Sequence, residues 1–298
     1  MPTATQRHLT DAQIAAYRRD GYLAIPGLID PGRIRELRAV TEEFVARSRQ
    51  VRGSDGIFDL DPRHRAEAPV LRRIKSPADN HPLYRWVAFE SPIPDIVAEL
   101  LGPDVKFHHS KLNLKGSHIG APVEWHQDAA FYPHSNDDVL AVGLLLDDAT
   151  PENGCLAVLP ASHRGVMHDH YDDHDRFTGC MRPADVACLE AEQGSRTRLL
   201  ALPAGSIHIH HYRLVHWSAP NTSPAERRLL INSYSAADAV ALVPNSTPSA
   251  LYGQIVRGRP ARTVRREAGV FRMPPDWGQG YTSIYELQSQ AASTAGSM

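Results

Sequence analysis

The second half of the chain alternates short apolar runs with turn residues, and this pattern limits the possible folds more than any other feature. From residue 104 onward, segments such as VKFHHSKLNLK, DVLAVGLLLD and RLLINSYS have period-two character, and Pro, Gly, Asn and Asp separate them. Many short strands divided by turns are typical of a β-sandwich or a β-barrel. The sequence therefore predicts a mainly β fold.

The first hundred residues have helical signals instead. Thr10 and Gln13 have capping-box spacing, and Gly21 provides a helix stop, so a helix is expected between them. A second helix is expected from Asp30-Pro31 to about Arg49, and a third over residues 91–102. Because helices come first and strands later, we expect flanking helices packed on the β core, and not an alternating βαβ sheet.

These signals predict one domain over residues 1–288. We expect a helical N-terminal layer over about 10–103, a β core over about 104–240 and a C-terminal segment over 241–288. Residues 161–197 are too long and polar for a hairpin loop, so they are interpreted as a lid insertion. Residues 289–298 (SQAASTAGSM) are predicted to form a disordered tail.

Composition excludes several classes of protein. The 32 basic and 34 acidic residues nearly cancel, which argues against a nucleic-acid partner. No run of about 18 apolar residues exists, so no membrane partner is expected. Three cysteines without CxxC spacing and an N-terminus without a secretory pattern favour a cytoplasmic location. Composition leaves open whether the chain forms a homo-oligomer.

The chain has sixteen histidines, so we first ask whether some of them bind a metal ion. In Trp125-His126-Gln127-Asp128, the imidazole and the carboxylate share a face if the segment is a strand. The motif alone is weak, because such a strand is more often plain surface. His216, in a later segment, is the candidate third ligand. Two histidines and one carboxylate leave open positions on an octahedral ion, as in non-haem Fe(II) oxygenases.

A second group of residues strengthens the metal hypothesis. Arg227 lies eleven positions after His216, on the next expected strand, and Ser218 shares a face with His216. A fixed guanidinium can bind both oxygens of the far carboxylate of a dicarboxylic co-substrate. The hydroxyl of Ser218 could donate to the same carboxylate.

The string HQD…NGCLAVLPASHRG…HWSAPN…RR resembles the phytanoyl-CoA dioxygenase family of Fe(II)/2-oxoglutarate oxygenases, and the resemblance runs from about residue 10 to about residue 240. It implies a double-stranded β-helix, the cupin-like jelly roll, with flanking helices. The implied iron ligands, which are also the catalytic residues, are His126, Asp128 and His216. The residues implied for 2-oxoglutarate are Arg227 and Ser218, and by analogy Lys111, Asn113 or Lys115. Leu144 stands near where some relatives carry an aromatic residue that packs beside 2-oxoglutarate; it is expected to fill that space without stacking, so the pocket is expected to differ.

The resemblance implies an enzyme with Fe(II), 2-oxoglutarate and O2 as cofactor and co-substrates. We expect it to hydroxylate an unactivated C–H bond of a small organic acid, acyl derivative or natural product, with release of succinate and CO2. Desaturation, epoxidation or ring formation by the same iron chemistry is an alternative. From other classes, a redox-silent cupin-like metal-binding module would explain the three ligands but not Arg227 or Ser218, and a family member without catalytic activity would not be expected to keep all of them.

Other histidines compete for these roles. His208, His210 and His211 precede His216 closely, but only His216 is followed by Trp-Ser and has an arginine at the right distance. His211 is interpreted either as lining the pocket or as held by a backbone hydrogen bond. The run of residues 168–175 (HDHYDDHD) could hold a second metal, but a solvated lid segment is preferred, because a mobile loop rarely preorganises a metal site.

Overall fold

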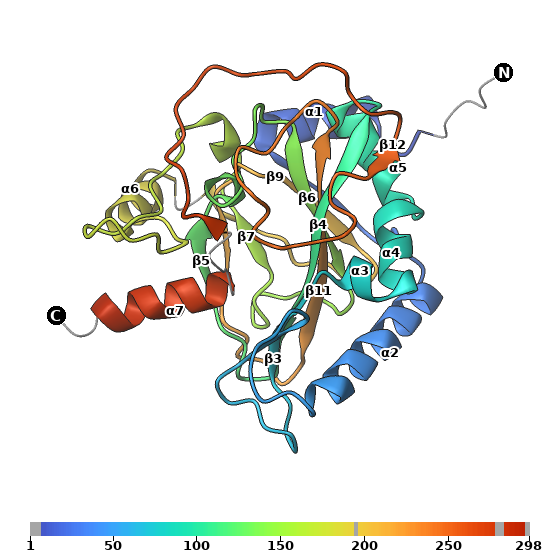
Figure 1. The fold of residues 1–298 in the computed structure, drawn as a ribbon, viewed down its shortest axis with the longest axis vertical. Helices are drawn as coiled ribbons and strands as arrows, with labels where there is room; N and C mark the ends of the chain where they lie inside the picture. The colour runs from blue at the N-terminus through green and yellow to red at the C-terminus, as the bar shows by residue number, and fades with distance from the viewer. Residues whose placement is uncertain (1–6, 194–195, 278–282, 296–298) are drawn as a thin grey trace.

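The computed structural model describes residues 7–193, 196–277 and 283–295 (Figure 1). Its helices are α1 (Asp11–Asp20), α2 (Pro31–Ser48), α3 (Pro77–Asn80), α4 (Pro82–Phe89), α5 (Ile93–Leu101), α6 (Pro183–Gln193) and α7 (Ile284–Ala295), with 3-10 turns η1 (Asp128–Ala130) and η2 (Ser162–Arg164). Its strands are β1 (Tyr22–Ile25), β2 (Phe58–Leu60), β3 (Leu71–Lys75), β4 (Val105–Lys115), β5 (Val123–His126), β6 (Val139–Leu145), β7 (Leu156–Val158), β8 (Arg198–Leu199), β9 (Ile207–His211), β10 (His216–Ser218), β11 (Arg227–Ala236) and β12 (Ile255–Arg257). None of the helices in these ranges is long and apolar enough to cross a membrane.

The predicted helix signals act as expected. Thr10 and Gln13 form a capping box at the start of α1, and Gly21 ends the helix in the left-handed region with φ of 78°. The Asp30 side chain caps α2, whose first residue is Pro31. Residues 93–101 form α5. The three expected helices are therefore confirmed, and α4 adds a fourth element to the same layer beside the large sheet (Figure 1).

Two antiparallel sheets form the core. The larger has the order β1-β9-β6-β11-β4-β3-β2, with β12 paired to β4, and the smaller has the order β5-β10-β7-β8. Neighbouring strands are mostly distant in sequence, so the chain passes repeatedly between the sheets. This is the two-sheet architecture of a double-stranded β-helix, and the predicted mainly β fold with flanking helices is confirmed.

One face of the large sheet packs against the helices. Leu144 of β6 and Leu230 of β11 are fully buried in the same apolar cluster as Leu37 and Phe44 of α2. Burying one such side chain contributes roughly 1.5–3 kcal/mol. Because side chains alternate along a strand, Leu144 faces the helices and not the space between the sheets. The expectation that Leu144 fills the space beside 2-oxoglutarate is therefore wrong.

A β-bulge sets which residues of β4 face the space between the sheets. Ser233 pairs with His109 but the next residue, Tyr234, pairs with Phe107, so His108 is an extra residue in β4. Before the bulge, Phe107 packs in the apolar cluster under the helices. After it, the odd-numbered His109 lies on the opposite face and lines a cavity between the sheets.

The end of the chain differs from the predicted disordered tail. Residues 284–295 form α7, which includes most of the segment expected to be disordered, while residues 296–298 lie outside the described residues. Gln288 explains this order, because its side chain accepts from the Glu124 N–H of β5 at 3.0 Å and donates to the Gly179 carbonyl at 2.9 Å. Ile284 and Tyr285 are buried at the start of the helix. These tertiary contacts stabilise a helix that composition alone does not predict.

Candidate active site

Three side chains predicted as metal ligands converge between the sheets. One ligand atom from each of His126, Asp128 and His216 lies within 4.8 Å of the other two, and all three residues are buried. His126 ends β5, His216 begins β10, and the two are direct partners in the antiparallel pairing of these strands. Within residues 7–193, 196–277 and 283–295, this is the one such group of three His, Cys, Asp or Glu side chains.

Strand β5 ends earlier than the sequence suggested, but His126 and Asp128 still lie on the same side of the backbone. β5 ends at His126, and Asp128 begins the 3-10 turn η1. Gln127 between them is still extended, with φ of −120° and ψ of 127°. One extended residue is enough to place its two neighbours on the same side of the backbone. The Nε2 of His126 therefore lies 3.7 Å from an oxygen of Asp128.

Backbone carbonyls orient both imidazoles. The Nδ1 of His126 lies 2.8 Å from the Glu124 oxygen, and the Nδ1 of His216 lies 2.8 Å from the Leu214 oxygen. A carbonyl can only accept, so Nδ1 carries the proton and Nε2 keeps a free lone pair for a metal. Burial lowers the pKa of His126 to about 4 and that of His216 well below its usual value. Both rings are therefore neutral near pH 7.

Asp128 is held as a carboxylate. Burial by itself would raise its pKa, but the positive charge of Lys111 and the nearby His210 outweigh burial and hold the pKa well below the usual range. The Nε2 of His210 lies 3.5 Å from the second carboxylate oxygen. Two neutral imidazoles and one ionised carboxylate form a ligand set suited to a divalent metal.

Gln127 and His170 support the segment between the ligands, and sequence reasoning missed both. The Nε2 of His170, which is 2% exposed, accepts the Gln127 backbone N–H at 3.0 Å. The Gln127 side chain accepts from the His168 N–H at 2.9 Å and donates to the Arg213 carbonyl at 2.8 Å. The insertion is therefore tied directly to the peptide between two candidate ligands. The sequence signal that could have pointed to His170 is the repeated occurrence of histidine within residues 168–174.

The acidic side chains in the remainder of the insertion form local turns and ion pairs. Asp172 accepts the backbone N–H groups of His174 and Arg176, which closes a local turn. Asp169 pairs with Arg272 at 2.6 Å and with Arg182 at 3.4 Å. These carboxylates are used by arginines and turns, and the described part of the chain contains no second metal-ligand group there.

The cavity beside these ligands has a volume of about 70 Å3 and is rich in cations. Arg73, Lys111 and Arg227 line it, together with Ser218 and Asn113, while Asp128 is the single carboxylate among its lining residues in the described ranges. Seven residues predicted to bind iron or 2-oxoglutarate, from strands β4, β5, β10 and β11 and the turn η1, therefore reach one space.

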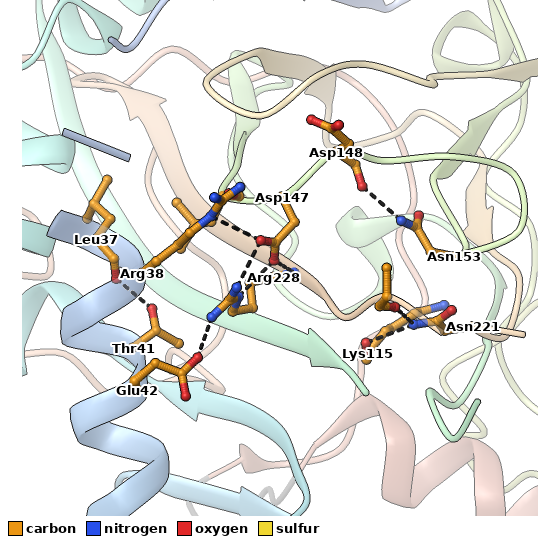
Figure 2. A network of polar contacts seen from close by, with 12 residues as sticks. Leu37, Arg38, Thr41, Glu42, Lys115, Asp147, Asp148, Asn153, Asn221 and Arg228 are labelled. Atoms are coloured by element: carbon orange, nitrogen blue, oxygen red, sulfur yellow. Dashed lines mark hydrogen bonds and ion pairs between the residues drawn. The ribbon is translucent and has the colours of Figure 1, made fainter. Parts of the chain in front are cut away.

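Lys115 has a different position from Lys111. It does not line the cavity, and its Nζ donates to the Ser218 carbonyl at 3.1 Å and to the Ala219 carbonyl. The next loop is closed by Asn221, whose amide donates to the Lys115 carbonyl at 3.0 Å (Figure 2). Of the two predicted lysines, only Lys111 reaches the cavity, and Lys115 joins β4 to the end of β10.

Arg227 and Arg228 are adjacent but have opposite environments. Arg228 points away from the cavity, donates to both oxygens of Asp147 at 2.8 and 2.9 Å, and pairs with Glu42 of α2 (Figure 2). Arg227 is 2% exposed, its Nε has no hydrogen-bond partner, and it forms no ion pair within the described ranges. Burial lowers the pKa of Arg227. A buried guanidinium without an anion indicates a ligand that supplies one.

The other candidate histidines have different positions relative to the cavity. His208 and His210 line the cavity, and none of their four ring nitrogens has a hydrogen-bond partner. Gly143 makes room for the first of them, since a Cβ there would lie 2.3 Å from the His208 Nε2. His211 does not line the cavity; its Nδ1 accepts the Arg213 N–H at 3.1 Å. The backbone interpretation of His211 is therefore confirmed.

Comparisons with known proteins agree with this architecture. The family model for phytanoyl-CoA dioxygenase (PhyH) matches residues 17–229. A probable alpha-ketoglutarate-dependent hypophosphite dioxygenase of Stutzerimonas stutzeri is 32% identical over 224 residues, covering 75% of this chain and 77% of the relative. The L-proline trans-4-hydroxylase of Streptomyces griseoviridis is 29% identical, covering 76% and 86%. The structure of EctD from S. alaskensis with 2-oxoglutarate and 5-hydroxyectoine superposes with a TM-score of 0.67 at 23% identity, covering 88% of each chain.

Proposed function

Because the chain belongs to the phytanoyl-CoA dioxygenase family and is a 2-oxoglutarate-dependent non-haem iron dioxygenase, we propose that His126, Asp128 and His216 bind its Fe(II). The observation that carries the assignment is the donor set itself. Three buried side chains meet within 4.8 Å, and both imidazoles keep Nε2 free because Nδ1 is used by a carbonyl. No proton has to leave before the metal binds, since the rings are already neutral and the carboxylate already charged.

Arg227 and Ser218 bind the far carboxylate of 2-oxoglutarate in this proposal. The unpaired guanidinium of Arg227 lies on the cavity wall, and Ser218 follows His216 by two residues on β10. Lys111 and Asn113, on the neighbouring strand β4, supply further polar contacts to the same co-substrate. The far carboxylate of 2-oxoglutarate would pair with the buried guanidinium of Arg227, which forms no ion pair in the described part of the chain.

When bound, iron and 2-oxoglutarate couple the release of succinate and CO2 to the oxidation of a second substrate by O2. The residues of this chain orient and enclose that chemistry. His170 and Gln127 hold the peptide between the ligands, which fixes the direction of the Asp128 carboxylate. Phe131 and Trp217 line the cavity beside the ligands and limit the entry of water.

The reaction we propose is hydroxylation of a C–H bond in a small polar molecule. The cavity has a volume of about 70 Å3 and is lined by three cations, which favours a small polar substrate. Relatives are named for hypophosphite, L-proline and ectoine, all small polar compounds. The redox-silent metal-binding module is set aside, because the curated relatives are named as dioxygenases and hydroxylases.

An anaerobic titration tests the assignment. Fe(II) and 2-oxoglutarate are added to metal-free protein, and the weak visible charge-transfer band of the chelate is recorded together with the bound iron. We expect the band only with both additions. Asp128→Ala should lose it, whereas Asp173→Ala, an exposed carboxylate of the insertion, should keep it. A full band in Asp128→Ala would show that the ligand assignment is wrong.

A further inference from the structure

Arg73 of β3 is a buried cation that the proposed iron and co-substrate sites do not use. It is 3% exposed and lines the same cavity as His126 and Arg227. Its Nε donates to the Asn113 side-chain oxygen at 3.1 Å, and its guanidinium lies 5.6 Å from the ring centroid of Tyr285 in α7. These contacts hold the guanidinium in place, but neither supplies a negative charge.

No carboxylate in the described segments forms an ion pair with Arg73. Asp59 is its cross-strand partner in β2, yet the two side chains do not come within ion-pair distance. The adjacent Arg72 gives a contrast, because its Nε lies 3.4 Å from an oxygen of Asp61. A buried guanidinium is costly unless an anion pairs with it, so Arg73 has the environment of a binding residue.

The charges around the cavity leave room for an anion beyond 2-oxoglutarate. Three cations and one carboxylate line it in the described structure. Fe(II) and the 2-oxoglutarate dianion carry equal and opposite charges, so binding both does not remove the excess of two positive charges. If Asp59 is counted as well, one positive charge remains. An anionic substrate neutralises this excess, whereas a neutral one does not.

Two hydroxyl groups line the same cavity as Arg73. They belong to Ser246 and Thr247, which are both 7% exposed and whose side chains form no hydrogen bond with the described residues. The Oγ of Ser76, just after β3, donates to the Pro248 carbonyl at 2.6 Å, which ties this loop to the strand of Arg73. Hydroxyls and a guanidinium all donate, and an oxyanion only accepts.

Resting on the proposed function, we propose that the substrate of this enzyme carries a small oxyanion, a carboxylate or a phosphorus oxyanion, which is bound by Arg73 with the hydroxyls of Ser246 and Thr247. The anion holds the substrate while a neighbouring bond faces the iron. A long neutral chain or a cationic substrate does not fit these donors.

Binding without turnover tests this proposal. The Fe(II) enzyme is kept anaerobic with saturating 2-oxoglutarate, so that Arg227 is occupied. Propionate, methylphosphonate and neutral propionamide are titrated separately, by calorimetry and by the change of the visible chelate band. We expect one or both anions to bind at least about 10-fold more tightly than propionamide, because hydrogen bonds to charged groups are the stronger ones. The better anion identifies the type of oxyanion.

Variants of the arginine pair complete the design. Arg73→Gln should weaken anion binding by about 10- to 100-fold, and Arg73→Lys, which keeps the charge, should restore most of it. Arg72→Gln, which removes the paired neighbour, should leave anion affinity unchanged. Anion affinity within twofold of wild type in Arg73→Gln, equal binding of propionamide, or no binding of either anion would each overturn the proposal. A missing chelate band in the wild type would instead refute the proposed iron and 2-oxoglutarate site.

Discussion

Replacing Arg227 by Gln should have opposite effects on co-substrate binding and on the stability of the metal-free protein. Arg227 is buried on the cavity wall without an anionic partner in the described residues, whereas Arg228, one residue later, pairs with Asp147 and Glu42. If Arg227 exists to bind 2-oxoglutarate, its charge is a cost until the co-substrate arrives. If Arg228 is structural, its charge is already compensated in the fold.

The magnitudes follow from this difference. Removing one partner of a buried ion pair typically costs about 3–5 kcal/mol, so Arg227→Gln should weaken 2-oxoglutarate binding by about 150- to 4,500-fold. Without co-substrate, the same change removes an uncompensated buried cation, so the free energy of unfolding should stay equal or rise. Arg228→Gln should lower the free energy of unfolding and leave 2-oxoglutarate affinity within about threefold, since Arg228 lies outside the cavity.

The assay needs no knowledge of the substrate. The dissociation constant of 2-oxoglutarate is measured anaerobically from the visible band of the Fe(II) chelate in wild type and both variants. Unfolding of the metal-free proteins is followed in urea. The crossed pattern is the informative result, because general damage to the fold would reduce both quantities in the same variant.

Two outcomes would refute the reasoning. If Arg227→Gln binds 2-oxoglutarate nearly as well as wild type, another cation holds the far carboxylate, and Lys111 becomes the first candidate because it lines the same cavity. If Arg227→Gln clearly destabilises the metal-free protein, the guanidinium has a structural partner, and its burial is not evidence of a ligand.

Three further predictions concern the surroundings of the site. His170→Ala leaves a buried backbone N–H without its acceptor, so it should lower the free energy of unfolding by about 1–3 kcal/mol and weaken Fe(II) binding about 10-fold, as measured by urea unfolding and metal titration. Burial lowers the pKa of His134 from 6.5 to about 4, so between pH 7 and pH 5 the unfolded chain takes up this proton and the folded protein does not. The free energy of unfolding should therefore fall by about 2 kcal/mol between pH 7 and pH 5. His134→Asn should reduce this pH dependence in chemical unfolding. Gly143→Ala would place a Cβ 2.3 Å from the His208 ring, so it should cost about 1–3 kcal/mol in urea unfolding, while Gly53→Ala, with no atom within 4 Å, should not.

Much of the fold was predictable because its signals are local. The capping box of Thr10 and Gln13, the left-handed Gly21 and the Asp30 cap depend only on neighbouring residues, and the structure contains all of them. The period-two runs likewise predicted the strands, because alternation is a property of one strand at a time. The prediction of a disordered tail was wrong because α7 depends on contacts of Gln288 with segments that are distant in the sequence.

The candidate site was likewise predictable only where its signals are local. The sequence named His126, Asp128 and His216, because two share a short motif and the third lies in a segment with its own motif. It could not separate Lys111 from Lys115, which have the same parity on β4, because only their different environments along the strand decide which one reaches the cavity.

By itself, the sequence determined the class of this protein, because the proposed metal ligands, the proposed co-substrate arginine and the two-sheet core all have signatures within short windows of the chain. The tertiary structure decided what surrounds them. It turned Leu144 toward the helices, brought His170 from the insertion onto the ligand peptide, and left Arg73 buried without an anion. Burial and charge pairing are properties of the whole assembly of strands, so residues that act through them are recognised only when the sheets have been brought together.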